Sequence, residues 1–145
     1  MRYRTLGRTG LRVSQIGLGA GGNSCLGRKK GKTEAESIQV VQRALELGIN
    51  LIDTSGRNLT ESIIARAIQG FDRKNIVLST KRTVSEAGVL NTADTFGEAL
   101  ETSFEILDTP YIDIMHLDWK STRLKSSHDE IAYTVFCLQK KLQTN

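Results

Sequence analysis

Two charged residues stand at positions where a parallel sheet would bring them together. Asp53 ends the apolar stretch 49–53, and Lys81 directly follows the apolar stretch 75–80. In parallel α/β sheets the carboxyl ends of neighbouring strands form one rim, and ligands bind there. We therefore expect the two charges to lie side by side, where an ammonium group next to a carboxylate can tune proton transfer. The alternative is a salt bridge at the rim that has no catalytic role.

The ends of two further apolar stretches supply the remaining candidates. Gly19, Ala20 and Gly21 close the first stretch, and such small residues allow the backbone of a cofactor to approach closely. They do not form the glycine-rich pattern, followed by an acidic residue about 20 positions later, that marks dinucleotide sites. His116 lies in the last stretch, where a hydrogen-bonded interior histidine is the alternative to a functional one.

The apolar stretches alternate with segments that have helical spacing. Residues 33–47, 60–68 and a segment from 91 or 92 to 107 repeat apolar residues every three or four positions, and Thr33 with Glu36 has the spacing of a capping box. Residues 3–13 contain two turn glycines and predict a small β-hairpin. Strands at 15–19, 49–53, 75–80 and 111–117, separated by helices, predict an α/β fold with a parallel sheet and right-handed crossovers.

Composition and charge narrow the function. The 145 residues are 39% hydrophobic and 25% charged, which is typical of a globular chain and excludes extensive disorder. The net charge of +4 comes mostly from residues 120–145, so we expect no nucleic-acid partner. No apolar run is long enough to cross a bilayer, so we expect no membrane association. Cys25 and Cys137 form neither a metal-binding pattern nor a disulfide framework, so we expect a cytoplasmic protein without a metal site.

Four segments resemble the NAD(P)H-dependent aldo-keto reductases, in the order in which that family carries them. Residues 1–19 (MRYRTLGRTGLRVSQIGLG) resemble the opening of the family, and residues 48–55 (GINLIDTS) resemble its second strand. Residues 79–81 (STK) resemble the end of the third strand, and residues 111–114 (YIDI) the start of the fourth. The resemblance implies the N-terminal half of a (β/α)8 TIM barrel, which needs about 250 residues when complete. It also implies NADPH as cofactor and a small carbonyl compound as substrate.

The family reduces carbonyl groups with four side chains, Asp, Tyr, Lys and His. By resemblance Asp53 corresponds to the Asp and Lys81 to the Lys, which together lower the pKa of the Tyr that protonates the carbonyl oxygen. The position of the Tyr is held by Asn58, whose amide donates hydrogen bonds but cannot deliver a proton. The loop 56–61 also looks about one residue or more short, so a local deletion is an alternative explanation.

The His of the family corresponds to Asp118 in this chain. His116 lies two positions earlier and therefore on the same face of the strand. We consider His116 as a substitute that acts from deeper in the barrel, besides the interior role given above.

The last 26 residues resemble no part of the family. Residues 120–145 look like translated sequencing-adaptor read-through, and a divergent fourth helix is the alternative. We therefore expect a partial reductase barrel in residues 1–119 and an artefactual tail in residues 120–145.

The expected function is that of an aldo-keto reductase-type oxidoreductase, present as a truncated and inactive fragment that does not bind NADPH tightly. The alternative is a noncatalytic binding or regulatory protein on a decayed reductase scaffold. Four strands without the rest of a barrel leave two exposed sheet edges, so we also expect self-association with a second copy.

Overall fold

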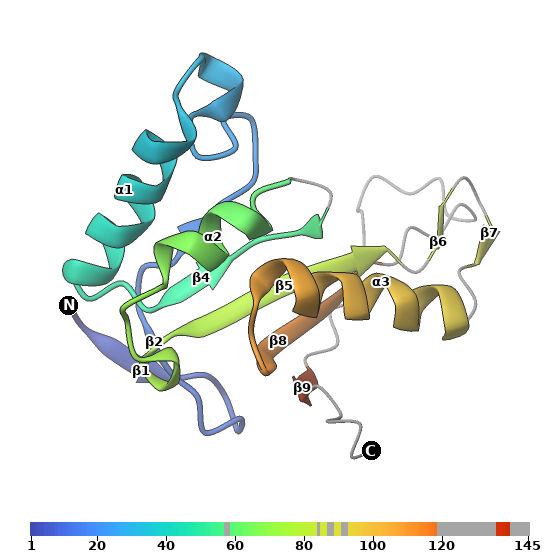
Figure 1. Ribbon diagram of the computed structural model, residues 1–145. Helices are drawn as coiled ribbons and strands as arrows, with labels where there is room; N and C mark the ends of the chain where they lie inside the picture. The colour runs from blue at the N-terminus through green and yellow to red at the C-terminus, as the bar shows by residue number, and fades with distance from the viewer. Residues whose placement is uncertain (57–58, 84, 87–88, 91–92, 119–135, 140–145) are drawn as a thin grey trace, which may run out of the picture.

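The computed structural model describes residues 1–56, 59–83, 85–86, 89–90, 93–118 and 136–139 (Figure 1). The strands, short 3-10 helices (η) and α-helices follow one another in this order: β1 (Tyr3–Thr5), β2 (Arg12–Ser14), β3 (Leu18–Gly19), η1 (Arg28–Lys30), α1 (Glu34–Glu46), β4 (Leu51–Asp53), α2 (Glu61–Ala67), η3 (Arg73–Asn75), β5 (Val77–Thr83), β6 (Ser85–Glu86), β7 (Val89–Leu90), α3 (Ala93–Leu107), β8 (Tyr111–Asp118) and β9 (Phe136–Gln139).

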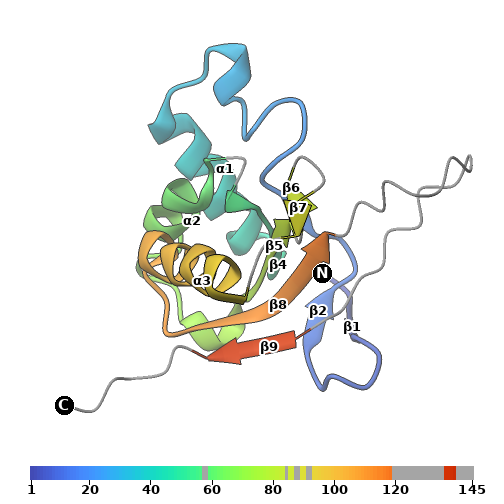
Figure 2. The same ribbon diagram turned by 90° about the vertical axis from the view of Figure 1, so that its right-hand side faces the viewer.

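The main sheet has the strand order β3-β4-β5-β8-β9, and its first four strands are parallel. The helices α1, α2 and α3 connect these strands and lie together on one side of the sheet (Figure 2). This arrangement confirms the predicted α/β fold with four parallel strands and three helices. The antiparallel pair β1–β2 confirms the predicted hairpin.

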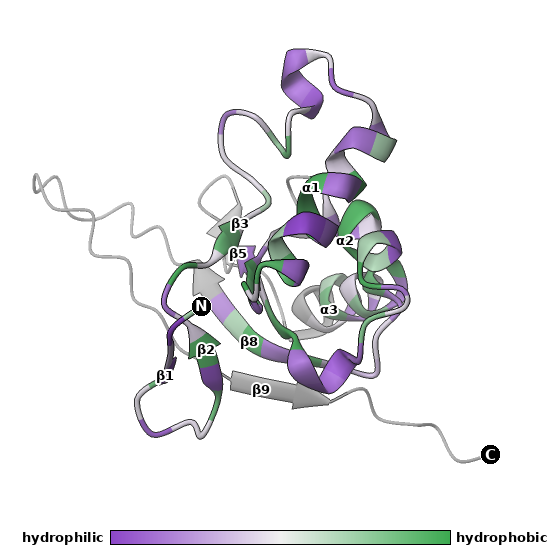
Figure 3. Cartoon of the chain, turned by 90° about the vertical axis from the view of Figure 1, so that its left-hand side faces the viewer, coloured by the Kyte–Doolittle hydropathy of each residue, from purple (hydrophilic) through white to green (hydrophobic). Residues whose placement is uncertain are grey.

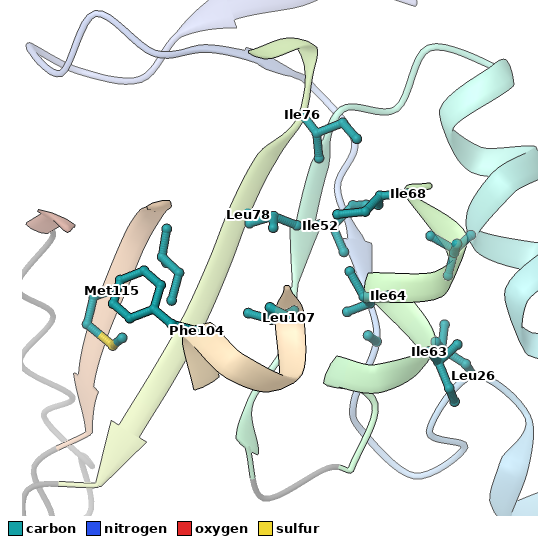
Figure 4. Packing of buried hydrophobic residues seen from close by; sticks show 14 residues of the cluster. Leu26, Ile52, Ile63, Ile64, Ile68, Ile76, Leu78, Phe104, Leu107 and Met115 are labelled. Atoms are coloured by element: carbon teal, nitrogen blue, oxygen red, sulfur yellow. The ribbon is translucent and has the colours of Figure 1, made fainter. Parts of the chain in front are cut away.

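The larger of two hydrophobic clusters among the described residues joins the sheet to the three helices. Ile52, Leu78 and Met115 project from the strands, and they pack with residues of α2 and α3 such as Ile64 and Phe104 (Figure 4). All five side chains are buried. Because β4 and β5 alternate in side-chain direction, the residues next to these core positions must point to the opposite face of the sheet.

The hairpin covers part of that opposite face. Val13 of β2 packs against Val77, the first residue of β5, and against Ile114 in β8. Of the two hairpin strands, β2 lies nearer to the sheet (Figure 3). The side chain of Asn50 holds the hairpin in place, because its Oδ1 accepts a hydrogen bond from the Ser14 amide at 2.7 Å. The hairpin closes the amino-terminal end of this face and leaves the carboxyl-terminal rim for polar side chains.

The edges of the sheet differ from the expectation of two exposed edges. Strand β9 pairs antiparallel with β8, with Ile112 opposite Leu138, so the β8 edge is covered within the chain (Figure 2). At the other end, β3 has β4 as its only sheet neighbour among the described strands. The small antiparallel pair β6–β7 was not predicted either, because two-residue strands carry no periodic signal.

Candidate functional site at the carboxyl-terminal rim

Asp53 and Lys81 form an ion pair across two neighbouring strands. The Nζ atom of Lys81 donates a hydrogen bond to Oδ2 of Asp53 at 2.6 Å. Asp53 ends β4, and its register partner on β5 is Ser79, two positions before Lys81, so all three side chains project from one face. The predicted proximity of the two charges is confirmed. Their side chains are 43% and 35% exposed, which leaves the pair open to a ligand.

Two further polar side chains extend this pair into a row. The hydroxyl of Ser79 donates to Oδ1 of Asp53 at 2.9 Å. The Nε2 atom of His116 lies 3.0 Å from the same hydroxyl oxygen. His116 reaches this position because β8 places it opposite Lys81 in the parallel ladder. Lys81, Asp53, Ser79 and His116 therefore form one hydrogen-bonded row at the rim, with Ser79 buried in its middle. The sequence did not predict Ser79 as part of this row.

The environment of His116 favours its neutral form. Burial of the imidazole lowers its pKa below the usual 6.5, and the positive charge of Lys81 acts in the same direction. The carboxylate of Asp53 opposes this shift but does not outweigh it. His116 thus sits in the rim as a half-buried ring whose Nε2 atom contacts the Ser79 hydroxyl.

The glycine-rich segment after β3 borders the same rim. Gly19 is the register partner of Asp53, and an added Cβ at Gly19 would meet no atom within 4 Å. The amide of Ala20 donates to the Asp53 carbonyl at 2.8 Å, so Ala20 is bound to β4 rather than available to a cofactor. The side of Gly19 that faces Asp53 is therefore open.

Asn58 and Asp118 are the two positions that depart from the family pattern, and the structure describes only Asp118. Asn58 lies outside the described residues. Asp118 is the last residue of β8, in register with Thr83 at the end of β5. Its backbone therefore lies at the same rim as the Asp53–Lys81 pair.

A second polar cluster lies behind the rim, on the helix side of the sheet. Glu61 is 1% exposed, and its Oε1 accepts hydrogen bonds from Thr80 at 3.0 Å and from Ser103 at 2.8 Å. Arg82 donates to Ser103, and its Nη2 lies 3.9 Å from Oε2 of Glu61. The cluster joins β5, α2 and α3. The sequence did not predict it, because an acidic residue in the first turn of a helix is normally exposed.

The described residues contain no group of three or more side chains suited to holding a metal ion. Within the same residues, no helix has the length and apolar character needed to cross a membrane.

Comparison with protein families gives one clear match. The model of the aldo/keto reductase family matches residues 16–143. L-galactose dehydrogenase of Arabidopsis thaliana is 33% identical over 122 residues, which cover 80% of this chain and 37% of that protein. Aldo-keto reductase YhdN of Bacillus subtilis is 32% identical over 136 residues, covering 82% of this chain and 38% of YhdN.

Solved structures agree with this match. The thermostable aldo-keto reductase Tm1743, solved with the inhibitor epalrestat, superimposes with a TM-score of 0.69 and 27% identity, covering 86% of this chain and 45% of that one. Aldo-keto reductase AKR11C1 from Bacillus halodurans, in its holo form, gives a TM-score of 0.67 and 31% identity, with coverages of 83% and 41%. The chain therefore spans less than half the length of these relatives.

Proposed function

Because the chain belongs to the aldo/keto reductase family, whose members are oxidoreductases on a TIM barrel, we propose that its rim is the Asp–Lys part of a carbonyl-reducing active site. The observation that supports this role is the ion pair of Asp53 with Lys81, 2.6 Å apart at the carboxyl ends of β4 and β5. In a reductase these two side chains would lower the pKa of a neighbouring acid that protonates a carbonyl oxygen. A small carbonyl compound is the proposed substrate.

NADPH is the proposed hydride donor. Its reactive ring would lie against the open side of Gly19, beside Asp53. Its phosphates would need residues beyond the part of the chain that the structure describes. We therefore propose that this chain alone neither binds NADPH tightly nor reduces carbonyl compounds. We also propose that residues 1–119 are the reductase portion and that residues 120–145 supply no group to the site, although β9 pairs with β8 and the family model reaches residue 143.

A chimaera tests the reductase role directly. Residues 1–118 would replace the matching part of YhdN, with and without the pair of changes Asn58→Tyr and Asp118→His. We expect NADPH-dependent reduction of a panel of small aldehydes and ketones only when both changes are present. A folded doubly changed chimaera that binds NADPH but stays inactive would overturn the proposed role of Asp53 and Lys81. Activity of the unchanged chimaera would instead overturn the requirement for the tyrosine and the histidine.

The isolated chain provides a simpler measurement. In a fluorescence titration of the 145-residue protein we expect no saturable NADPH signal at micromolar concentrations. Saturable binding in that range would contradict the proposal that a second barrel half must supply the phosphate site.

A noncatalytic binding protein on a decayed reductase scaffold is the second candidate. Asn58 and Asp118, which replace the acid and the histidine of the family, favour it. If the chimaera that carries both changes folds and binds NADPH as tightly as YhdN but still shows no turnover, this second function is preferred.

Self-association is a separate proposal and concerns the edge of β3, which among the described strands pairs only with β4. Next to this edge, Val40 and Leu47 of the α1 segment are 49% and 55% exposed beside a groove that also contacts Leu18. Unpaired backbone groups of an edge strand favour addition of another strand, so a second copy is the proposed occupant. Light scattering coupled to size exclusion should show a dimer that Leu47→Glu converts to a monomer; a monomeric wild type contradicts it.

We also propose a cytoplasmic location, because Cys25 is a buried free thiol and a reducing compartment would keep it so.

A further inference from the structure

We propose that Ser79 is a positioning residue. Its hydroxyl donates its only proton to Asp53 and accepts a hydrogen bond from His116, and this selects which ring nitrogen of His116 carries the proton. The inference deepens the proposed function, because it adds Ser79 and His116 to the Asp53–Lys81 pair. Its geometry, however, is a property of the chain itself and does not depend on carbonyl reduction.

Proton counting at Ser79 gives the direction of each hydrogen bond. A serine hydroxyl has one proton to donate, and an ionised carboxylate only accepts. With Oδ1 of Asp53 2.9 Å away, the hydroxyl proton of Ser79 points to Asp53. The contact of 3.0 Å between Ser79 Oγ and His116 Nε2 must then be a hydrogen bond donated by the ring. His116 is therefore expected as the Nε2–H tautomer.

The same arrangement divides the two oxygens of Asp53. Oδ1 accepts from Ser79 and Oδ2 accepts from Lys81, at 2.9 and 2.6 Å. Two donors on different oxygens fix the rotation of the carboxylate. Ser79 therefore holds Asp53 in the orientation in which Oδ2 faces the Lys81 ammonium group.

A nucleophilic role for Ser79 is excluded by its burial. A hydroxyl between a carboxylate and an imidazole has the partners of an activated nucleophile. Ser79, however, is only 2% exposed, lying beneath the rim between β4 and β8. A substrate atom therefore has no path to the Ser79 oxygen. The Ser79 hydroxyl instead links Asp53 to His116.

The charged groups around His116 agree with a neutral ring that donates through Nε2. Two charged groups act on the ring of His116: the Asp53 carboxylate, which belongs to β4, and the Lys81 ammonium group, which belongs to β5. Burial and Lys81 together favour the neutral imidazole. When the ring does take up a second proton, this proton goes to Nδ1, and the Nε2–H bond to Ser79 is retained.

The tautomer can be measured on the whole 145-residue chain by long-range proton–nitrogen NMR spectra of histidine-labelled protein. His128 is the other histidine, so the variant His128→Gln assigns the signals. We expect His116 as the Nε2–H tautomer at pH 8. The decisive variant is Asp53→Ala: without its acceptor, the Ser79 hydroxyl is free to donate to Nε2, and the ring should change to the Nδ1–H tautomer.

Two further variants distinguish the effect of the Ser79 hydrogen bonds from general destabilisation of the fold. Ser79→Ala removes the acceptor of Nε2–H and should abolish the tautomer preference, whereas Ser37→Ala deletes an equally buried hydroxyl that bonds to Leu26 and should leave it intact. Asp53 is partly exposed, so its alanine variant tests the proposal even where Ser79→Ala does not fold. An Nδ1–H tautomer in the wild type, or no change in folded Asp53→Ala, would overturn the inference. Neither result bears on reductase activity, because the spectra require no cofactor or turnover.

Discussion

Arg73 donates a hydrogen bond to Asp113 at 2.7 Å while its guanidinium lies 4.0 Å above the centre of the Tyr111 ring. The same Asp113 oxygen accepts the amide proton of Leu78 at 2.9 Å. Side-chain exposures of 16% and 9% show that this ion pair is almost removed from solvent. It connects η3 to the start of β8 at the end of the sheet opposite the candidate site.

Removing the carboxylate of this pair should destabilise the fold strongly. Asp113→Ala leaves the Arg73 charge buried and the Leu78 amide without its acceptor, so we expect a loss of about 3–5 kcal/mol in the free energy of unfolding. Urea denaturation of the variant measures this loss. The control is Glu105→Ala, which removes an exposed carboxylate of α3 and should cost much less. A loss below about 1 kcal/mol in Asp113→Ala would contradict a structural role.

The substitution Gly56→Ala should create a steric clash with Arg82, which belongs to the second polar cluster. A Cβ built on Gly56 would overlap Nη1 of Arg82. Arg82 cannot swing aside freely, because its Nε donates to the Ala99 carbonyl at 3.0 Å and Nη2 donates to Ser103. We expect Gly56→Ala to cost about 1–3 kcal/mol in unfolding free energy.

A double-mutant cycle identifies the cause of that cost. In an Arg82→Ala background the side chain that blocks the methyl group is absent, so the added cost of Gly56→Ala should nearly vanish. An undiminished cost in this background would show that the backbone at Gly56, rather than Arg82, forbids the methyl group.

The start of α1 should make stability depend on pH in the acid range. Hydrogen bonds from Lys32 and from Thr33 lower the pKa of Glu36 from its ordinary 4.5 to about 2. A carboxyl group with a depressed folded-state pKa stabilises the fold fully above 4.5, and this contribution is lost as the pH falls toward 2. We expect Glu36→Gln to flatten the dependence of unfolding free energy on pH between those values. Glu98→Gln, which removes an exposed carboxylate of α3 away from the capping box, is the control, and equal flattening in both variants would contradict the prediction.

Lys81 should matter far more for chemistry than for stability. Because the Lys81 and Asp53 side chains are 35% and 43% exposed, solvent screens the pair, and Lys81→Met should change the unfolding free energy by less than about 1 kcal/mol. In the chimaera that carries Asn58→Tyr and Asp118→His, the same change should lower kcat/KM about 100-fold or more. Equal turnover of this chimaera with and without Lys81→Met would make the pair a plain salt bridge.

Local signals allowed the main elements to be predicted from the sequence. Thr33 and Glu36 form the capping box that their spacing indicated, because a helix cap depends on residues three positions apart. The contact between Asp53 and Lys81 was also predictable, because any parallel sheet with short crossovers brings the ends of such strands to one rim. Four segments with family resemblance were enough to identify the family.

Other features depend on contacts between residues far apart in the chain, and only the tertiary structure decided them. Ser79 became part of the site because β5 lies between β4 and β8, which places its hydroxyl between Asp53 and His116. Glu61 is buried because α2 packs it against Thr80 and Ser103, although its position in the first helical turn suggested exposure. The types and spacing of the residues determined which charged groups reach the rim. The order of the strands and the direction of the side chains determined which of these groups touch, because a hydrogen bond requires its two atoms to lie within about 3 Å.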